Sequence, residues 1–137
     1  MRSILRPMLQ ALRVKNLAIV EDLEVEFGPG LNVITGETGA GKSIIMSALA
    51  LVLGERADKD MIRTGETQCT VEATFALKDA AGINRIMEEI GAGPCEEGRL
   101  IARRVISATG AAKHLVNDSS TTLQVLKRVG DLLVDTH

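Results

Sequence analysis

One run in this chain has the spacing G-x-x-x-x-G-K-S of a phosphate-binding loop: Gly36, Glu37, Thr38, Gly39, Ala40, Gly41, Lys42 and Ser43. In such a loop the glycines let backbone N–H groups turn toward an anion, and the lysine reaches the β- and γ-phosphates. The serine hydroxyl is a ligand for Mg²⁺. A β-rich run, residues 31–35, precedes the loop, and a helix-forming run, residues 43–53, follows it. The sequence therefore predicts that residues 36–43 bind ATP with Mg²⁺, aided by the positive end of a helix dipole.

The composition argues against several other classes of function. The 137 residues fit one domain or part of one, and a net charge of −2 gives no overall basic signature for nucleic acid. Two Phe with no Tyr or Trp argue against a platform for base stacking. Cys69 and Cys95 lack metal-ligand spacing, which is typical of reduced thiols in a cytoplasmic protein. We expect no targeting segment and no membrane partner, because no apolar run is long enough to span a bilayer.

Hydrophobic periodicity predicts a mixed α/β lobe. Alternation or β-rich composition predicts strands over residues 9–14, 19–27, 31–35, 70–77, 99–107 and 112–116. Helical spacing predicts helices over residues 43–53, 80–90 and 121–134, the last opened by a capping-box pattern at Thr121 and Gln124. The helix over 43–53 is apolar on nearly all sides, which is typical of burial between layers. This order fits an ATPase lobe with added antiparallel strands better than a doubly wound kinase core.

ATP hydrolysis requires parts that this sequence does not show. A second acidic strand should hold Mg²⁺, and a polar residue should place the attacking water. The one apolar run that ends in an acidic residue, 132–135, continues a helical pattern and is interpreted as a helix end. We therefore expect the front portion of an ATPase.

The loop and its surroundings resemble the RecN family of SMC-like bacterial DNA-repair ATPases. The residues that carry the resemblance are the extended loop, 33–43, and the segments 16–20, 53–57, 62–65, 103–107, 115–117 and 132–137. The resemblance covers residues 9–137, with 1–8 as an N-terminal extension. It implies a P-loop NTPase fold, the N-terminal lobe of an ABC-type ATPase head whose C-terminal lobe lies beyond a coiled coil.

Family membership implies further properties. Two heads would form a head-to-head homodimer around two ATP molecules and couple closure to DNA in double-strand break repair and recombination. The parent would be an ATP hydrolase of the cytoplasm, at the nucleoid during repair, whereas this stretch alone is expected to be inactive. Arg63 occupies the place of an arginine near the nucleotide in SMC-type heads; a solvated loop arginine is the alternative. The family often has Gly where this chain has Asp118, which questions the shape of that turn.

Two other functions stay open at this point. One is a complete small P-loop kinase, and the other is a non-hydrolysing ATP-gated dimerisation module. DNA contact by this chain alone is predicted to be weak, electrostatic and carried by Arg56, Lys59, Arg63, Arg103 and Arg104.

Overall fold

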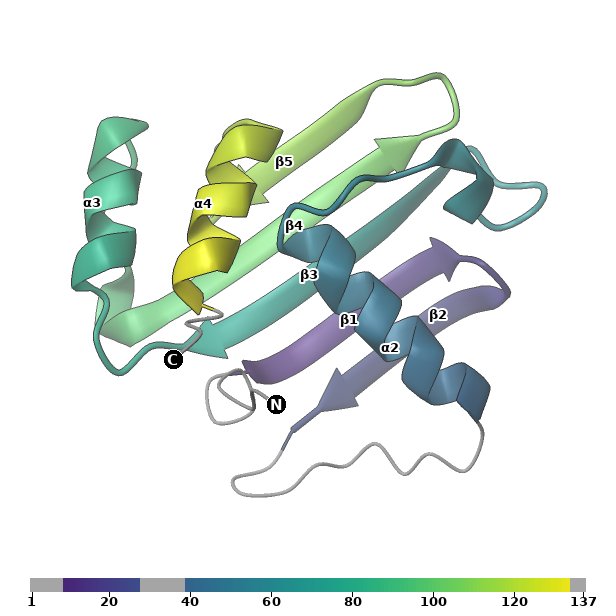
Figure 1. Ribbon diagram of the computed structural model, residues 1–137, viewed down its shortest axis with the longest axis horizontal. Helices are drawn as coiled ribbons and strands as arrows, with labels where there is room; N and C mark the ends of the chain where they lie inside the picture. The colour runs from purple at the N-terminus through teal and green to yellow at the C-terminus, as the bar shows by residue number, and fades with distance from the viewer. Residues whose placement is uncertain (1–8, 28–38, 134–137) are drawn as a thin grey trace.

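A six-stranded antiparallel sheet organises this chain, with strand order β2-β1-β3-β4-β5-β6. The computed structural model describes residues 9–27 and 39–133 (Figure 1). The strands are β1 Leu9–Leu17, β2 Val20–Glu26, β3 Gln68–Ala76, β4 Arg99–Ser107, β5 Ala112–Val116 and β6 Ser119–Ser120. The helices are α2 Gly39–Val52, α3 Ala81–Glu89 and α4 Leu123–Leu133, with short 3-10 turns at Lys59–Met61 and Glu96–Gly98.

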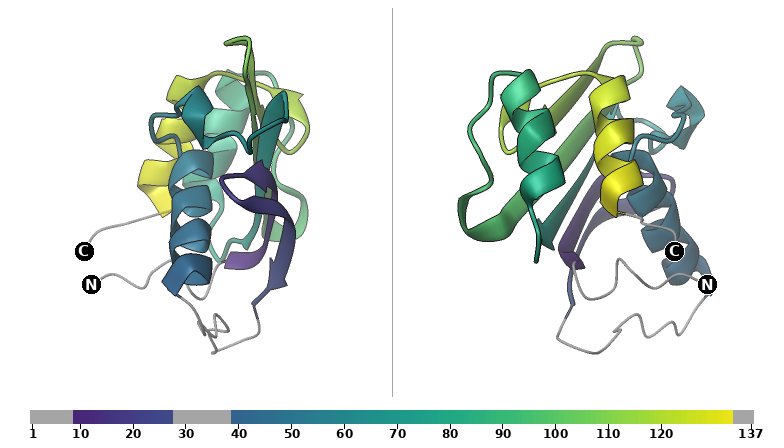
Figure 2. Two further views of the ribbon diagram at one scale, coloured as in Figure 1. Left: turned by 90° about the vertical axis from the view of Figure 1, so that its right-hand side faces the viewer. Right: turned by 60° about the vertical axis from the view of Figure 1, so that its left-hand side comes forward.

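The described helices all lie on one face of the sheet. Figure 1 shows α2, α3 and α4 in front of the strands, and the edge-on view in Figure 2 separates the helical layer from the sheet. Alternating strand residues point to this layer because successive side chains of a strand face opposite sides. The core contains Leu12, Val14, Val71, Ala73, Phe75, Leu100, Ala102 and Val116 of the sheet and Ile45, Ala48, Leu51, Val52, Ile83, Ile86, Met87, Leu126, Val129 and Leu133 of the helices.

The opposite face of the sheet carries polar side chains. Glu24, Arg13, Glu72 and Arg103 follow one another across β2, β1, β3 and β4 as cross-strand partners. Among the described residues, no helix covers this face (Figure 2). One face of an antiparallel sheet is commonly solvated in this way, which explains the alternation of apolar and polar residues along each strand.

Most predicted elements are present, and the β4–β5 hairpin has the predicted bounds. β1 is longer than the predicted strand over 9–14, because Leu17 is buried and pairs with both Val20 and Ile62. β6 was not predicted; it is only two residues long, too short for a periodic signal. The predicted strand over 31–35 lies outside the described residues.

The capping box predicted at Thr121 is wrong by one residue. α4 begins at Leu123, and Thr122 Oγ1 accepts a hydrogen bond from Val125 N at 3.2 Å. Thr121 N instead donates to His114 O at 2.8 Å, which holds Thr121 at the end of the sheet. The tertiary contact of Thr121 therefore moves the N-cap one residue along the chain.

Candidate nucleotide-binding site

The phosphate-loop sequence leads into a helix, but this helix begins four residues before the predicted start at residue 43. α2 begins at Gly39, inside the motif, whereas Gly36, Glu37 and Thr38 lie outside the described residues. From Gly39 to Lys42 the structure describes helical backbone only. Ser43, whose side chain is described, is exposed. The first turn of α2 has no acidic residue, so none of its own carboxylates neutralises the positive end of the helix. This arrangement suits an anion with an accompanying Mg²⁺.

The sheet fixes α2 along one side. Ile45, Ala48, Leu51 and Val52 are buried, and α2 contacts β1, β3 and β4. Met46, on the other side of the helix, is 64% exposed. Among the described residues, the helix is therefore covered on one side only. The prediction of burial between two layers is met only in part.

Arg104 fixes the C-terminal end of α2. Its Nη1 donates to Leu51 O at 2.7 Å and to Glu55 O at 2.5 Å, and the side chain is buried with 4% exposure. Burial lowers the pKa of Arg104, but a guanidinium remains protonated at neutral pH. His114 on β5 is the cross-strand partner of Arg104. Burial lowers the pKa of His114, and the nearby charge of Arg104 lowers it further.

The structure overturns the prediction that Arg104 contacts DNA. Arg103 is exposed on the open face of the sheet, and Arg104 points to the helices, because adjacent residues of a strand face opposite sides. The sequence carried a signal for this. Leu100, Ala102 and Ile106, which are buried, share the parity of Arg104 along β4.

Arg63 lies beside the turn between β1 and β2. Its backbone N–H donates to Asn16 O at 2.9 Å, and the adjacent Ile62 bridges to Leu17. Its side chain, 35% exposed, forms an ion pair with Glu66 at 3.8 Å. Because the loop residues before Gly39 lie outside the described part, a position of Arg63 near the nucleotide stays a prediction.

A shallow basic depression lies on the open face of the sheet. It has a volume of about 430 Å³ and is lined by Arg13, Lys15, Asn16, Gln68, Thr70, Glu72 and Arg103. Only Arg103 of this set was predicted as a contact for DNA. Arg13 and Lys15 on β1 were not predicted, because only the pairing of β3 with both β1 and β4 brings residues some ninety positions apart in the sequence to one depression. Arg56 and Lys59, also predicted, are exposed in the stretch after α2.

The remaining chemistry-bearing groups form no second site. Cys69 and Cys95 are free and buried, and burial raises the pKa of both thiols. Within residues 9–27 and 39–133, no group of three or more His, Cys, Asp or Glu side chains is placed to hold a metal ion. None of the helices in these ranges is long and apolar enough to cross a membrane.

The fold and the loop sequence together define a nucleotide-binding domain of the P-loop class. The chain belongs to the AAA domain family, whose model matches residues 11–129. It is similar to the DNA repair protein RecN of Bacillus subtilis, with 40% identity over 130 residues that cover 95% of this chain and 22% of RecN. RecN of Vibrio cholerae is 42% identical over 131 residues, covering 95% of this chain and 23% of that protein. The chain thus spans less than a quarter of the length of these relatives.

A solved structure of an SMC ATPase has the same fold. It matches with a TM-score of 0.69 at 21% identity and covers 93% of this chain and 80% of that one. The predicted fold, an N-terminal P-loop lobe of an SMC-like ATPase head, is confirmed, as is the resemblance to RecN.

Proposed function

We propose that this chain is the ATP-binding portion of a RecN-like ATPase that acts in DNA double-strand break repair and recombination. One observation carries the proposal: the motif Gly36–Ser43 runs directly into α2, whose first turn has no acidic residue and whose Ser43 is exposed. The RecN relatives, which are named DNA repair proteins, support the biological role.

Each part of the site would have its own chemical role. Backbone N–H groups of the loop and the N-terminus of α2 would surround the phosphates, and Lys42 would pair with their β- and γ-oxygens. The Ser43 hydroxyl would be a ligand for Mg²⁺, which neutralises phosphate charge when bound. Arg63 would lie near the nucleotide.

The partners of the whole protein follow from its relatives. The SMC ATPase with the same fold is known for ATP-driven dimerisation and DNA-stimulated activation. We propose that the parent of this chain likewise forms a head-to-head homodimer with a C-terminal lobe, binds DNA and acts in the cytoplasm at the nucleoid. A complete small kinase is not favoured, because the described sheet is wholly antiparallel and the relatives are RecN proteins.

Replacement of Lys42 by Ala tests nucleotide binding. The change removes a charge-assisted hydrogen bond worth about 1.5–3 kcal/mol, so the Kd for Mg-ATP should rise by about tenfold or more. Calorimetric titration of the 137-residue chain measures this. Lys59→Ala, which removes an exposed lysine from another segment, is the matched control and should bind as the wild type does. Equal affinities of wild type and Lys42→Ala would refute the assignment of the loop.

A further inference from the structure

The C-terminal end of α2 contains a buried charge without an acidic partner. Arg104 is 4% exposed and forms no ion pair with any residue in the described ranges. Its Nε also has no hydrogen-bond partner there. Burial of an unpaired cation is costly, so a leucine or methionine would fill the same space at a lower cost. The hydrogen bonds of the guanidinium therefore indicate why a charged side chain stands here.

Those hydrogen bonds go to the end of the phosphate-loop helix. The last carbonyls of a helix have no partner within it and carry partial negative charge. Arg104 Nη1 donates hydrogen bonds to Leu51 O in the last turn and to Glu55 O just beyond the helix. A single side chain of β4 thus holds both the helix and the chain that leaves it.

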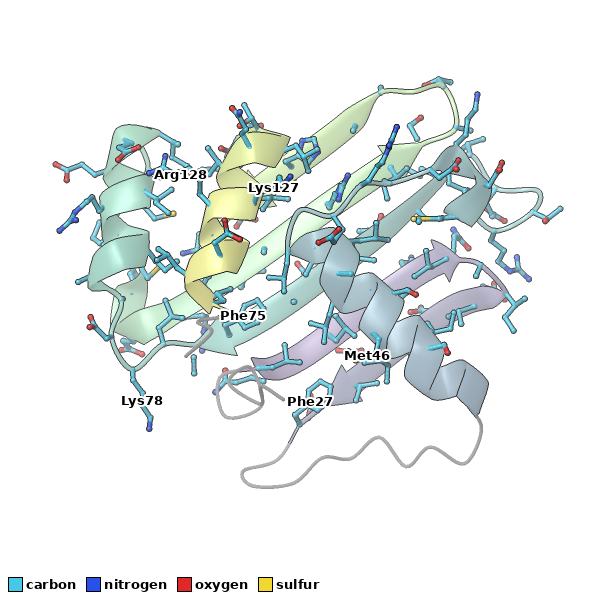
Figure 3. The ribbon with its side chains drawn as sticks, viewed as in Figure 1. Phe27, Met46, Phe75, Lys78, Lys127 and Arg128 are labelled. Atoms are coloured by element: carbon cyan, nitrogen blue, oxygen red, sulfur yellow. The ribbon has the colours of Figure 1, made fainter. Side chains whose placement is uncertain are left out.

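Two glycines bring α4 against the same end of α2. A Cβ on Gly130 of α4 would lie 2.5 Å from Leu53 O. A Cβ on Gly54 would lie 2.8 Å from the Cα of Lys127, which projects from α4 (Figure 3). Both distances are too short for any residue but glycine, so backbone meets backbone at this contact. We call Arg104, Gly54 and Gly130 the socket of α2.

A fixed end sets the direction of the whole helix. α2 has 14 residues, a length of about 21 Å at 1.5 Å per residue. A tilt of about 5° at the socket would move the N-terminal end by roughly 2 Å on that length. Such a shift is large compared with the tolerance of hydrogen bonds from backbone N–H groups to phosphate.

We propose that the socket positions the nucleotide site: Arg104 and Gly130 hold α2 so that its N-terminus is aligned for the phosphates. Both are positioning residues, because they contact the C-terminal end of α2 and would act on the nucleotide only through this helix. This inference rests on the proposed function, since it assigns a role toward the ATP that the loop binds.

Arg104→Met tests the socket from the side of the sheet. The change keeps the length and apolar stem of the side chain but removes the hydrogen bonds to Leu51 O and Glu55 O. We expect the Kd of the 137-residue chain for Mg-ATP to rise by about three- to thirty-fold. The matched control is Arg103→Met, the same change one residue away on the open face, with affinity within about twofold of wild type. Arg104→Lys, which retains a charged donor, should recover most of the loss.

Gly130→Ala tests the socket from the side of α4. Its added methyl group must displace Leu53 O, so affinity should fall although alanine favours a helix. Gly82→Ala is the control, because a Cβ there meets only the end of the Leu132 side chain, at 3.2 Å. If Arg104→Met does not fold, Gly130→Ala against Gly82→Ala decides the question alone.

A stability control separates positioning from general weakening. Asn117→Ala removes the hydrogen bonds that Asn117 forms with Ile101 N and Arg99 O. Neither hydrogen bond involves α2. We expect it to lower the melting temperature but leave the Kd unchanged. The proposal is overturned if folded Arg104→Met and Gly130→Ala bind Mg-ATP as the wild type does, or if Asn117→Ala loses affinity to the same degree. If wild type itself binds no nucleotide, the proposed function fails instead.

Discussion

Asp118 occupies a backbone conformation that suits glycine. Asn117 and Asp118 link β5 to β6 with φ of 49° and 68°, and Val116 pairs with Ser119 across them. A two-residue turn with positive φ at both positions favours Asn-Gly. The turn thus has positive φ at both central residues, with Asp at the second of them.

Replacement at this position should change stability in both directions. Asp118→Gly relieves the left-handed strain and should raise the free energy of unfolding by about 0.5–1 kcal/mol. Asp118→Ala, which lacks the short polar side chain that tolerates this region, should lower it by a similar amount, roughly 0.5–1 kcal/mol. Urea denaturation of the three proteins measures the order Gly, Asp, Ala. A reversed order would show that the turn is not as described.

His114 makes stability depend on pH. Burial, and then the charge of Arg104, lower its pKa in the folded protein. Between the folded pKa and the ordinary value of about 6.5, the unfolded chain therefore binds more protons than the native one. The stabilising contribution is complete above about pH 6.5 and is lost as the pH falls through the folded pKa.

We expect the free energy of unfolding to fall between about pH 7.5 and pH 5, and to fall less in His114→Gln. Denaturation curves over this range measure the difference, in which the titration of carboxylates shared by both proteins cancels. Identical pH profiles would mean that His114 titrates alike in the native and unfolded states.

At the scale of elements, Thr122 is the N-cap of α4. Its Oγ1 accepts from Val125 N, and its carbonyl accepts the first helical hydrogen bond, from Leu126 N. Loss of such a cap costs about 1 kcal/mol, so Thr122→Ala should lower the free energy of unfolding by about that amount. Thr121→Ala is the matched control and should stay within about 0.5 kcal/mol of wild type. Thermal denaturation compares the two; a larger effect at Thr121 would restore the capping box predicted from the sequence.

For the whole molecule, we expect the 137-residue chain to hydrolyse ATP at a negligible rate. Catalysis requires groups that stabilise the charge of the transition state from beyond the phosphate loop. By resemblance, the acidic strand, the catalytic Glu and the signature motif belong to the C-terminal lobe. A phosphate-release assay of wild type should therefore match Lys42→Ala. Turnover that Lys42→Ala abolishes would instead support a complete ATPase or a small kinase.

The elements predicted correctly are those whose hydrophobic periodicity follows directly from their own burial. β3 alternates cleanly because one of its faces is buried and the other is partly solvated. α3 carries Ile83, Ile86 and Met87 at the helical spacing that predicted this helix, and all three are buried. β1 and the start of α4 differ because contacts outside the local periodic pattern, with Ile62 and His114, decide where those elements begin or end.

The sequence alone predicts the chemistry of the phosphate loop, because its glycines, Lys42 and Ser43 are contiguous and would act through local backbone geometry. Only the tertiary structure decided which arginines face water and which face the helices. The pairing of β3 with β1 and β4 places Arg13 and Lys15 on the same face of the sheet as Arg103, whereas strand alternation turns Arg104 to the other face. The socket likewise joins β4, α4 and the turn after α2, through contacts that no local pattern encodes.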